Sequence, residues 1–371
     1  MTKLKFCKSC LVPNSRANIF LNGNGECNAC INHKRKTTVS WKSRLKELKI
    51  LIKKSKKKSK IFDCLIPVSG GKDSTWQVHQ CLKLGLKPLA LTYKTPGRTK
   101  IGDENLKNLI ELGVDHIDWT VNPKVEAKFM LEAFKKKGAT AIPMHFAIHN
   151  ISQIIAKNFN IPLIVWGENS ADEYGHTDVK TSGSKMSSNW RKFFGVSNGT
   201  DIYDWIDKKI TKKDLASYNV KNANNYEVLE IFLGYFLKWD PAKIAKYSKK
   251  IGFKTLLKSK TGYYKFADID CDFISIHHWL KWYKFGFNRS FDNLSLEIRN
   301  GRITRKKAIE IISKNQNFLP IKDISKFCKF TNISKQEFFK IAEKFRNKKI
   351  WKKVNNIWMI ENFLIKNWKW K

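Results

Sequence analysis

The residues of this sequence that most directly suggest chemistry form one short run between an apolar stretch, 61–68, and a helix expected to begin near Ser74. Two glycines after a strand let backbone N–H groups approach an anion, and a helix start adds partial positive charge. A lysine can neutralise phosphate oxygens, and serine hydroxyls can donate to them. An ordinary Gly-Gly turn is the alternative. We predict a phosphate-binding loop made of Ser69, Gly70, Gly71, Lys72, Asp73 and Ser74.

A second polar segment follows another apolar stretch and is rich in acids. It contains Glu168, Asp172 and Glu173. With Asp73, these side chains could supply the oxygen ligands that Mg²⁺ prefers beside nucleotide phosphates. Solvated loop acids are the alternative for Asp172 and Glu173. The solvated-loop alternative is weaker for Glu168, which comes directly after the expected strand. We predict that Lys72, Asp73 and Glu168 are catalytic.

Four of the eight cysteines form two Cys-x2-Cys pairs with sixteen residues between the pairs. This spacing can place four thiolates tetrahedrally around Zn²⁺, as in a zinc ribbon. Four thiolates leave no open position for a catalytic water, so the predicted site is structural. An iron–sulfur cluster also fits four cysteines, whereas disulfides are disfavoured in a reducing compartment. The predicted metal ligands are Cys7, Cys10, Cys27 and Cys30.

Arginine is scarce in this chain, yet four of its ten arginines lie within seventeen residues. Clustered guanidinium groups suit a phosphorylated or nucleotide-linked substrate. The alternative is a set of ion pairs on helix surfaces with Asp292, Glu297 and Glu310. The predicted substrate-binding residues are Arg289, Arg299, Arg302 and Arg305.

The elements that must position these residues alternate between short apolar stretches and helical stretches. This pattern predicts an α/β fold with a doubly wound parallel sheet, in which ligands bind beyond the carboxyl ends of the strands. The phosphate loop and the acidic segment both follow such ends. The expected strands are 61–68, 88–93, 116–121 and 161–166, and the expected helices are 74–84, 103–112, 123–136 and 146–159.

The chain divides into four expected segments. These are a zinc ribbon at 1–40, a basic linker helix at 41–60, the sheet domain at 61–200 and a helical acceptor- or partner-binding region at 201–371. Within the sheet domain, 177–200 is expected to be a lid loop. In the last segment we expect helices at 224–239, from Pro241 and at 272–284, and a final helix that Ser334 caps.

Charge and hydropathy limit the possible functions. No run of about 18 apolar residues occurs, and the first residues lack the apolar core of a signal peptide, so we expect a cytoplasmic protein. The net charge of +39 favours polyanionic partners, but Lys supplies most of it and Arg, the better reader of phosphates and bases, is rare. Nucleic acid is therefore an unlikely but open partner.

The loop order resembles the SGGxDS motif (PP-loop) of the ATP pyrophosphatases, which have a HUP-like fold, and not the Walker order. More widely, the chain resembles the bacterial N-acetyl sugar amidotransferases of lipopolysaccharide and nonulosonic-acid pathways. It departs from that family in having Gly286-Phe287-Asn288-Arg289 where Gly-Tyr-Gly-Arg is usual. The resemblance rests on Cys7-x2-Cys10-Leu-Val-Pro-Asn and on residues 24–30, 67–74, 167–170, 173–174, 284–287 and 297–305.

This resemblance implies an enzyme that uses ATP with Mg²⁺ and carries a structural Zn²⁺. The carbonyl oxygen of a sugar N-acetyl group would attack the α-phosphorus, releasing pyrophosphate, and ammonia would then displace AMP to leave an acetamidino group. In the family, ammonia comes from a separate glutaminase that works with a cyclase-like partner. We expect the same here, because Cys64 and Cys81 lie in an expected strand and helix without a glutaminase constellation.

The alternative function is that of a tRNA-modifying PP-loop enzyme of the thiolating or lysidine-forming kind. It would account for the net charge of +39, and some thiolating enzymes carry zinc ribbons. Sulfur transfer usually needs reactive cysteines, and only Cys81, Cys271 and Cys328 follow the loop. Of these, Cys271 lies between two aspartates, which would raise the pKa of its thiol.

Overall fold

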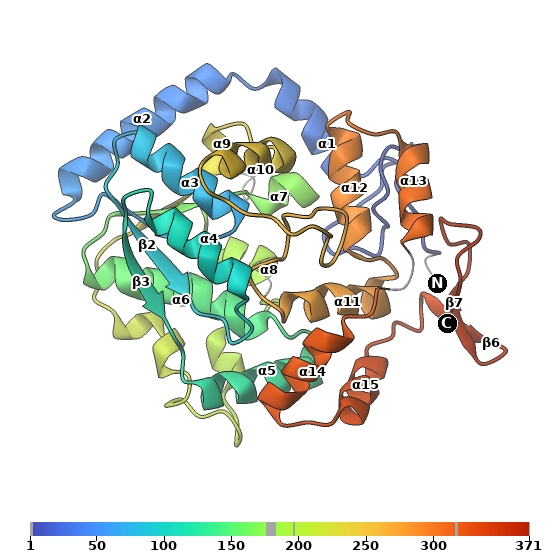
Figure 1. The fold of residues 1–371 in the computed structure, drawn as a ribbon. Helices are drawn as coiled ribbons and strands as arrows, with labels where there is room; N and C mark the ends of the chain where they lie inside the picture. Colours follow the sequence, from blue (N-terminus) through green and yellow to red (C-terminus); the bar gives the residue numbers. More distant parts are fainter. Residues whose placement is uncertain (1–2, 176–182, 196, 316–317, 371) are drawn as a thin grey trace.

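The computed structural model describes residues 3–175, 183–195, 197–315 and 318–370, without the side chains of 171 and 172. Its centre is a five-stranded sheet in the order β3-β2-β1-β4-β5, with every neighbouring pair parallel. The prediction of a doubly wound α/β sheet is therefore confirmed (Figure 1). The strands are β1 (Cys64–Pro67), β2 (Pro88–Tyr93), β3 (Asp115–Trp119), β4 (Leu163–Trp166) and β5 (Leu229–Phe232).

Helices cover both faces of the sheet, because alternate residues of each strand point to opposite sides. In β1, Leu65 packs into one core with α5 and α6, whereas Ile66 packs into the other with α2, α3, α4 and α10. The two cores bury the apolar faces of these helices. Their bounds are α2 (Trp41–Lys58), α3 (Lys72–Lys83), α4 (Lys100–Ile110), α5 (Pro123–Lys137), α6 (Ile142–Asn158) and α10 (Pro241–Lys250).

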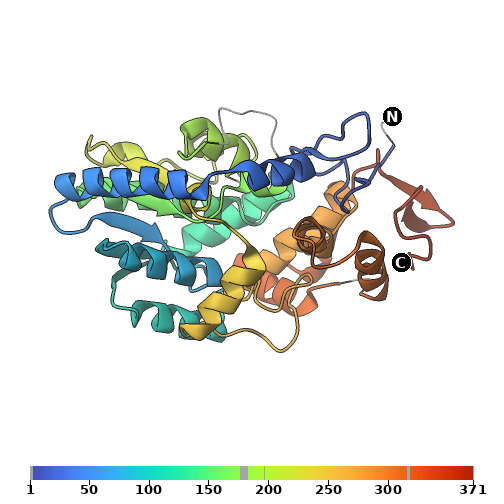
Figure 2. The same cartoon turned by 90° about the horizontal axis from the view of Figure 1, so that it is seen from above.

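The C-terminal part is mostly helical, as predicted, and lies beside the sheet together with the N-terminal segment (Figures 1 and 2). Phe134 of α5 packs into a core with α11, α14 and α15, which joins this part to the sheet. Ser334 caps α15, accepting a hydrogen bond from Glu337 N, but a β-hairpin and not a helix follows as the last element. The elements are α11 (Ile274–Phe285), α12 (Arg289–Arg299), α13 (Arg305–Lys314), α14 (Ile321–Thr331), α15 (Lys335–Lys344), β6 (Trp351–Val354) and β7 (Ile357–Ile360).

The remaining elements are short. Some of them lie between the sheet and the N-terminal segment, and others pack on the face of the sheet that α6 covers. They are α1 (Asn28–Arg35), η1 (Lys36–Thr38), α7 (Ser170–Tyr174), α8 (Ser188–Phe194), η2 (Ile202–Trp205), η3 (Ala216–Tyr218), η4 (Val220–Asn222) and α9 (Leu233–Phe236).

One expected helix of the sheet region is absent. The helix expected at 224–239 is instead strand β5 followed by α9, because residues 229–232 pair with β4 along their whole length. The segment 177–200, expected to be a lid, contains α8, while 176–182 and 196 lie outside the described residues, so the lid stays a prediction. The four-segment division stays a prediction, although β5 carries the sheet beyond residue 200.

No helix in the described part of the chain combines the length and the apolar character needed to cross a membrane.

A buried carboxyl group lies within the core on the α5 side of the sheet. Glu126 of α5 accepts hydrogen bonds from the hydroxyl of Tyr93 in β2 and, at 3.4 Å, from that of Tyr218 in η3. Burial raises the pKa of Glu126 to about 7. Its proton is therefore held more tightly in the folded chain than in the unfolded chain.

We expect Glu126 to make stability depend on pH. The pKa of Glu126 is higher in the folded chain than in the unfolded chain. Its contribution to the free energy of unfolding is therefore fully present below about pH 4.5 and is lost as pH rises through 7, a decrease on the order of 3 kcal/mol. Glu126→Gln should flatten this decrease, measured as the free energy of unfolding in urea from pH 4.5 to 8.5. Substitution of the exposed Glu47 by Gln should leave it unchanged. Parallel curves for wild type and Glu126→Gln would contradict the assignment.

Candidate functional site

The predicted phosphate loop follows β1 and leads into α3. It lies where the strand order reverses, because the strand after β1 is toward one edge of the sheet and the strand after β4 is toward the other. Gly70 has φ +79°, and a Cβ there would lie 2.7 Å from Leu106 N of α4, so only glycine fits. Gly71 caps α3 without a side-chain hydrogen bond. The first N–H groups of α3 are therefore left to bind an anion.

Hydrogen bonds within the loop hold it in shape. Gly71 N donates to Ser69 Oγ at 3.3 Å, and Ser74 Oγ donates to Gly71 O at 3.0 Å. Lys72 Nζ forms an ion pair with the carboxylate of Asp73 and lies 5.4 Å from the ring centre of Phe266. The loop is thus preformed, and its lysine lies beside its acid.

A cavity of about 360 Å³ opens at this end of the sheet. It brings together Ser69, Asp73 and Ser74 of the loop with Glu168, which follows β4. The phosphate loop and the acidic segment, both selected by sequence analysis, therefore line the same cavity. Its apolar walls are formed by Leu91, Tyr93, Met144, Ala147, Ile148, Ile151, Trp166, Trp239 and Ile274.

Three carboxyl groups line this cavity, those of Asp73, Glu168 and Asp270. Burial and the nearby Asp73 raise the pKa of Glu168 to about 7, and burial also raises the pKa of Asp270. Asp73 Oδ1 is buried and, among the described residues, has no hydrogen-bond partner. Three carboxyl groups that line one cavity, two of them with a pKa raised by burial, suit a divalent cation, which would offset their charge.

Of the other two acids of the acidic segment, Glu173 is not among the described residues that line the cavity. Glu173 forms an ion pair with Lys36 of η1, which directs its carboxylate toward the N-terminal segment. The side chain of Asp172 lies outside the described residues.

Sequence reasoning missed several polar residues of this cavity, among them Asp270 and Gln77. Asp270 is brought in because Thr99 N donates to its carbonyl oxygen at 3.2 Å and Gly102 of α4 allows close contact, a Cβ there lying 2.9 Å from Asp270 Cα. Gln77 of α3 donates to the carbonyl oxygen of Val165 in β4. The acidic run 268–272 is the signal that could have indicated Asp270.

Cys271 also lines the cavity, with its Sγ 3.1 Å from Thr95 Oγ1. Burial and the neighbouring Asp270 raise the pKa of this thiol to about 11, despite its hydrogen bond with Thr95. A thiol with such a pKa is a poor nucleophile at neutral pH.

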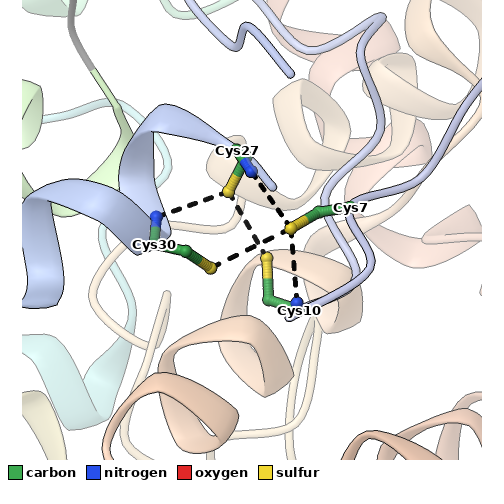
Figure 3. A group of neighbouring side chains, drawn as sticks. All are labelled: Cys7, Cys10, Cys27 and Cys30. Carbon is green, nitrogen blue, oxygen red and sulfur yellow. Dashed lines mark hydrogen bonds between the residues drawn. The ribbon is translucent and has the colours of Figure 1, made fainter. Parts of the chain in front are cut away.

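The four predicted metal-binding cysteines form a second centre (Figure 3). Their Sγ atoms all lie within 4.8 Å of one another, with 3.7 Å between Cys10 and Cys27 and 4.0 Å between Cys7 and Cys30. A zinc–sulfur bond of about 2.3 Å gives a tetrahedron with edges of about 3.8 Å, so the spacing fits one ion. A cluster of several irons and sulfides would hold the thiolates farther apart.

The thiolates are also supported by backbone donors, as expected for metal knuckles. Cys10 N and Cys27 N donate to Cys7 Sγ at 3.4 and 3.2 Å, and Cys30 N donates to Cys27 Sγ at 3.4 Å (Figure 3). All four side chains are buried. The residues therefore fit a structural Zn²⁺.

The predicted substrate-binding arginines do not share one space, and none lines the 360 Å³ cavity. Arg289 lies nearest to it, with Nε 3.5 Å from Asp268 and a charge that acts on Glu168. Arg302 forms ion pairs with Glu297 at 2.6 Å and Asp240 at 2.8 Å, as in the ion-pair alternative.

The other two arginines act on the cysteine centre, Arg305 through a hydrogen bond and Arg299 through its charge. Arg305 Nε donates to Cys10 O at 3.0 Å. Arg299 has a buried guanidinium whose two terminal nitrogens find no hydrogen-bond partner among the described residues, and its charge acts on Cys10 and Cys30. Four thiolates around Zn²⁺ carry a net charge of −2, which a buried guanidinium offsets. Arg299 is thus placed to stabilise the metal centre.

Comparison with protein families finds a match for the C-terminal part of the chain. Residues 259–364 match the family model described as LPS biosynthesis protein WbpG-like, C-terminal domain. This part of the chain is similar to that domain, and it contains Asp268, Asp270 and the arginine cluster. No curated protein matches the chain.

Two solved structures are similar over most of their own length. NMN synthetase from Francisella tularensis is 13% identical, with 81% of this chain and 96% of that chain covered and a TM-score of 0.35. A predicted subunit of tRNA methyltransferase from Methanocaldococcus jannaschii is 15% identical, with 64% and 91% covered and a TM-score of 0.27. At these scores neither likeness supports a function.

We expect Arg299→Gln to weaken metal binding, because the charge of the thiolates loses its compensation. The zinc-loaded protein should release Zn²⁺ to a chromogenic chelator about tenfold faster or more. Arg299→Lys should retain most of the effect of the charge, and Arg35→Gln, exposed on the helix that carries Cys30, should release Zn²⁺ at the wild-type rate. A wild-type rate for Arg299→Gln would contradict this role.

Proposed function

We propose that the protein is an ATP-dependent, AMP-forming amidotransferase that acts on an N-acetyl sugar in lipopolysaccharide or related surface-glycan biosynthesis. The observation that carries this proposal is the Gly70–Gly71 loop at the start of α3, which faces a cavity lined by Asp73, Glu168 and Asp270. The match of residues 259–364 to a lipopolysaccharide biosynthesis domain supports the glycan setting.

The loop would bind the phosphates of ATP. The first N–H groups of α3 and the hydroxyls of Ser69 and Ser74 would donate to phosphate oxygens, and Lys72 would turn from Asp73 to neutralise them. Mg²⁺, which neutralises charge on a leaving pyrophosphate, would be held by Asp73, Glu168 or Asp270, since these line one cavity. The apolar walls would exclude water from the reacting atoms.

The reaction would then proceed in two displacements. The carbonyl oxygen of the N-acetyl group attacks the α-phosphorus of ATP, a P–O bond forms, and pyrophosphate leaves. Ammonia adds to the activated carbon, and the C–O bond breaks to release AMP and leave an acetamidino group. Arg289, whose charge acts on Glu168, is the predicted arginine best placed to meet an anionic part of the sugar.

Ammonia would come from a separate glutaminase subunit with its cyclase-like partner. Cys64 and Cys81, both buried in the core below the loop, have no position from which to act as a glutaminase nucleophile. In the described part of the chain, Cys271 is the cysteine that reaches the cavity, and its thiol has a raised pKa.

The second candidate is a tRNA-modifying enzyme with the same ATP chemistry. The presence of Cys271 in the cavity and the net charge of +39 favour it. The raised pKa of the thiol and the match to a lipopolysaccharide biosynthesis domain favour the sugar enzyme.

We expect Lys72→Ala and Asp73→Asn each to reduce AMP formation by about a hundredfold or more, because each removes charge from the phosphate site. The measurement is AMP released from ATP with ammonium and an N-acetyl sugar. Lys83→Ala, exposed at the other end of α3, is the matched control and should keep wild-type turnover. Unchanged turnover in a folded Lys72→Ala protein would contradict the ATP site.

We expect AMP release to require both ammonium and a free or UDP-linked N-acetyl sugar, because the acetyl oxygen is the nucleophile. A sugar with a free amine in place of the acetamido group should give only background AMP. AMP release stimulated by tRNA alone would assign the protein to the second candidate.

A further inference from the structure

A second cavity, of about 220 Å³, lies on another face of α6 from the first. Met144 and Ile148 of this helix line the first cavity, whereas His145 and His149 line the second, since successive helical residues point about 100° apart. The other described residues of the wall that could bind a ligand are Asn150, Ser188, Arg191, Lys192, Tyr203, Asn219 and Lys221.

Positive charge predominates in this cavity. Arg191 and Lys192 of α8 and Lys221 of η4 line it, against the single carboxylate of Asp201. Asp201 is already engaged, because its carboxylate caps η2 and accepts a hydrogen bond from Tyr203 N at 3.3 Å. Arg191 is paired with Glu230, so Lys192 and Lys221 are the cations of this wall that have no ion pair among the described residues.

A buried ring nitrogen of His149 in this wall has no hydrogen-bond partner among the described residues. His149 is 8% exposed and packs between Trp166 and Trp190, with ring centres at 4.8 and 6.1 Å. Its Nδ1 atom is buried and makes no hydrogen bond within the described chain, whereas Nδ1 of His145 lies 2.7 Å from Ala141 O. Unpaired buried polar atoms are rare, so a ligand or water is expected beside His149.

We propose that this cavity binds a small phosphate-bearing molecule. A phosphate presents several acceptor oxygens and up to two negative charges, which match an arginine fork and two lysines. Arg191 uses one terminal nitrogen on Glu230 and has further donors to offer. Lys221 is held near the cavity by the ring of Tyr203, 5.1 Å from its Nζ.

A short chain of contacts joins this site to the first cavity. Glu230 of β5 pairs with Arg191 through Oε1 and accepts from Trp166 Nε1 through Oε2 at 2.7 Å. Trp166 lines the first cavity. Glu230 therefore contacts one residue from the wall of each cavity.

The test is calorimetric titration of the full-length protein with inorganic phosphate. We expect Lys192→Gln/Lys221→Gln to bind phosphate about tenfold more weakly than wild type or worse, with an unchanged thermal midpoint because both lysines are exposed. Lys124→Gln/Lys340→Gln removes the same charge from exposed positions outside this wall and should bind as wild type does.

Lys72→Ala separates this site from the predicted phosphate loop. If the second cavity binds phosphate, Lys72→Ala retains that binding although it no longer forms AMP. The inference is therefore tested independently of the proposed function. Equal affinity in Lys192→Gln/Lys221→Gln and wild type would overturn the inference. So would loss of phosphate binding in Lys72→Ala alone, or the absence of binding to wild type.

Discussion

The close approach of Gly70 to α4 is the constraint on which the catalytic end of the sheet depends. A side chain at Gly70 would collide with the backbone of Leu106, so the phosphate loop rests directly on this helix. On the same helix, Gly102 allows an equally close approach of the backbone at Asp270. Two glycines thus bring the loop and a C-terminal acid, distant in sequence, to one helix and one cavity.

The cysteine centre is tied to the same end of the molecule by ion pairs. Arg16, which follows the first cysteine pair, lies 2.9 Å from Asp292 of α12 and stacks over Tyr174 of α7 at 4.7 Å. Lys36 pairs with Glu173 of α7. Because α7 directly follows Glu168, folding of the cysteine segment supports the acidic side of the cavity. A structural metal there would affect the site without taking part in its chemistry.

Much of this fold could be predicted from the sequence, for identifiable reasons. β1, β2 and β4 are buried on both faces and therefore read as continuous apolar runs. β5 was missed because it continues without a turn into α9, which makes the whole run long enough for a helix. The cysteine spacing was sufficient to predict the cluster, since a tetrahedral site constrains both pairs.

The candidate site was predicted less completely, because its members come from distant segments. Ser69, Asp73 and Glu168 follow strands and could be placed by sheet topology. Asp270 enters through contacts between loops and α4, which no local period reveals. The arginines cluster in sequence, but α12 ends at Arg299 and the chain turns at Gly301, which has a positive φ, so Arg299 and Arg302 reach different partners.

The origin of the oxygen in AMP tests the central proposal most directly. An N-acetyl sugar labelled with ¹⁸O in its acetyl carbonyl would be incubated with ATP, ammonium and the protein, and the AMP analysed by mass spectrometry. Attack of that oxygen on the α-phosphorus predicts one ¹⁸O atom in each AMP formed. AMP without label, formed at the same rate, would contradict the proposed activation step.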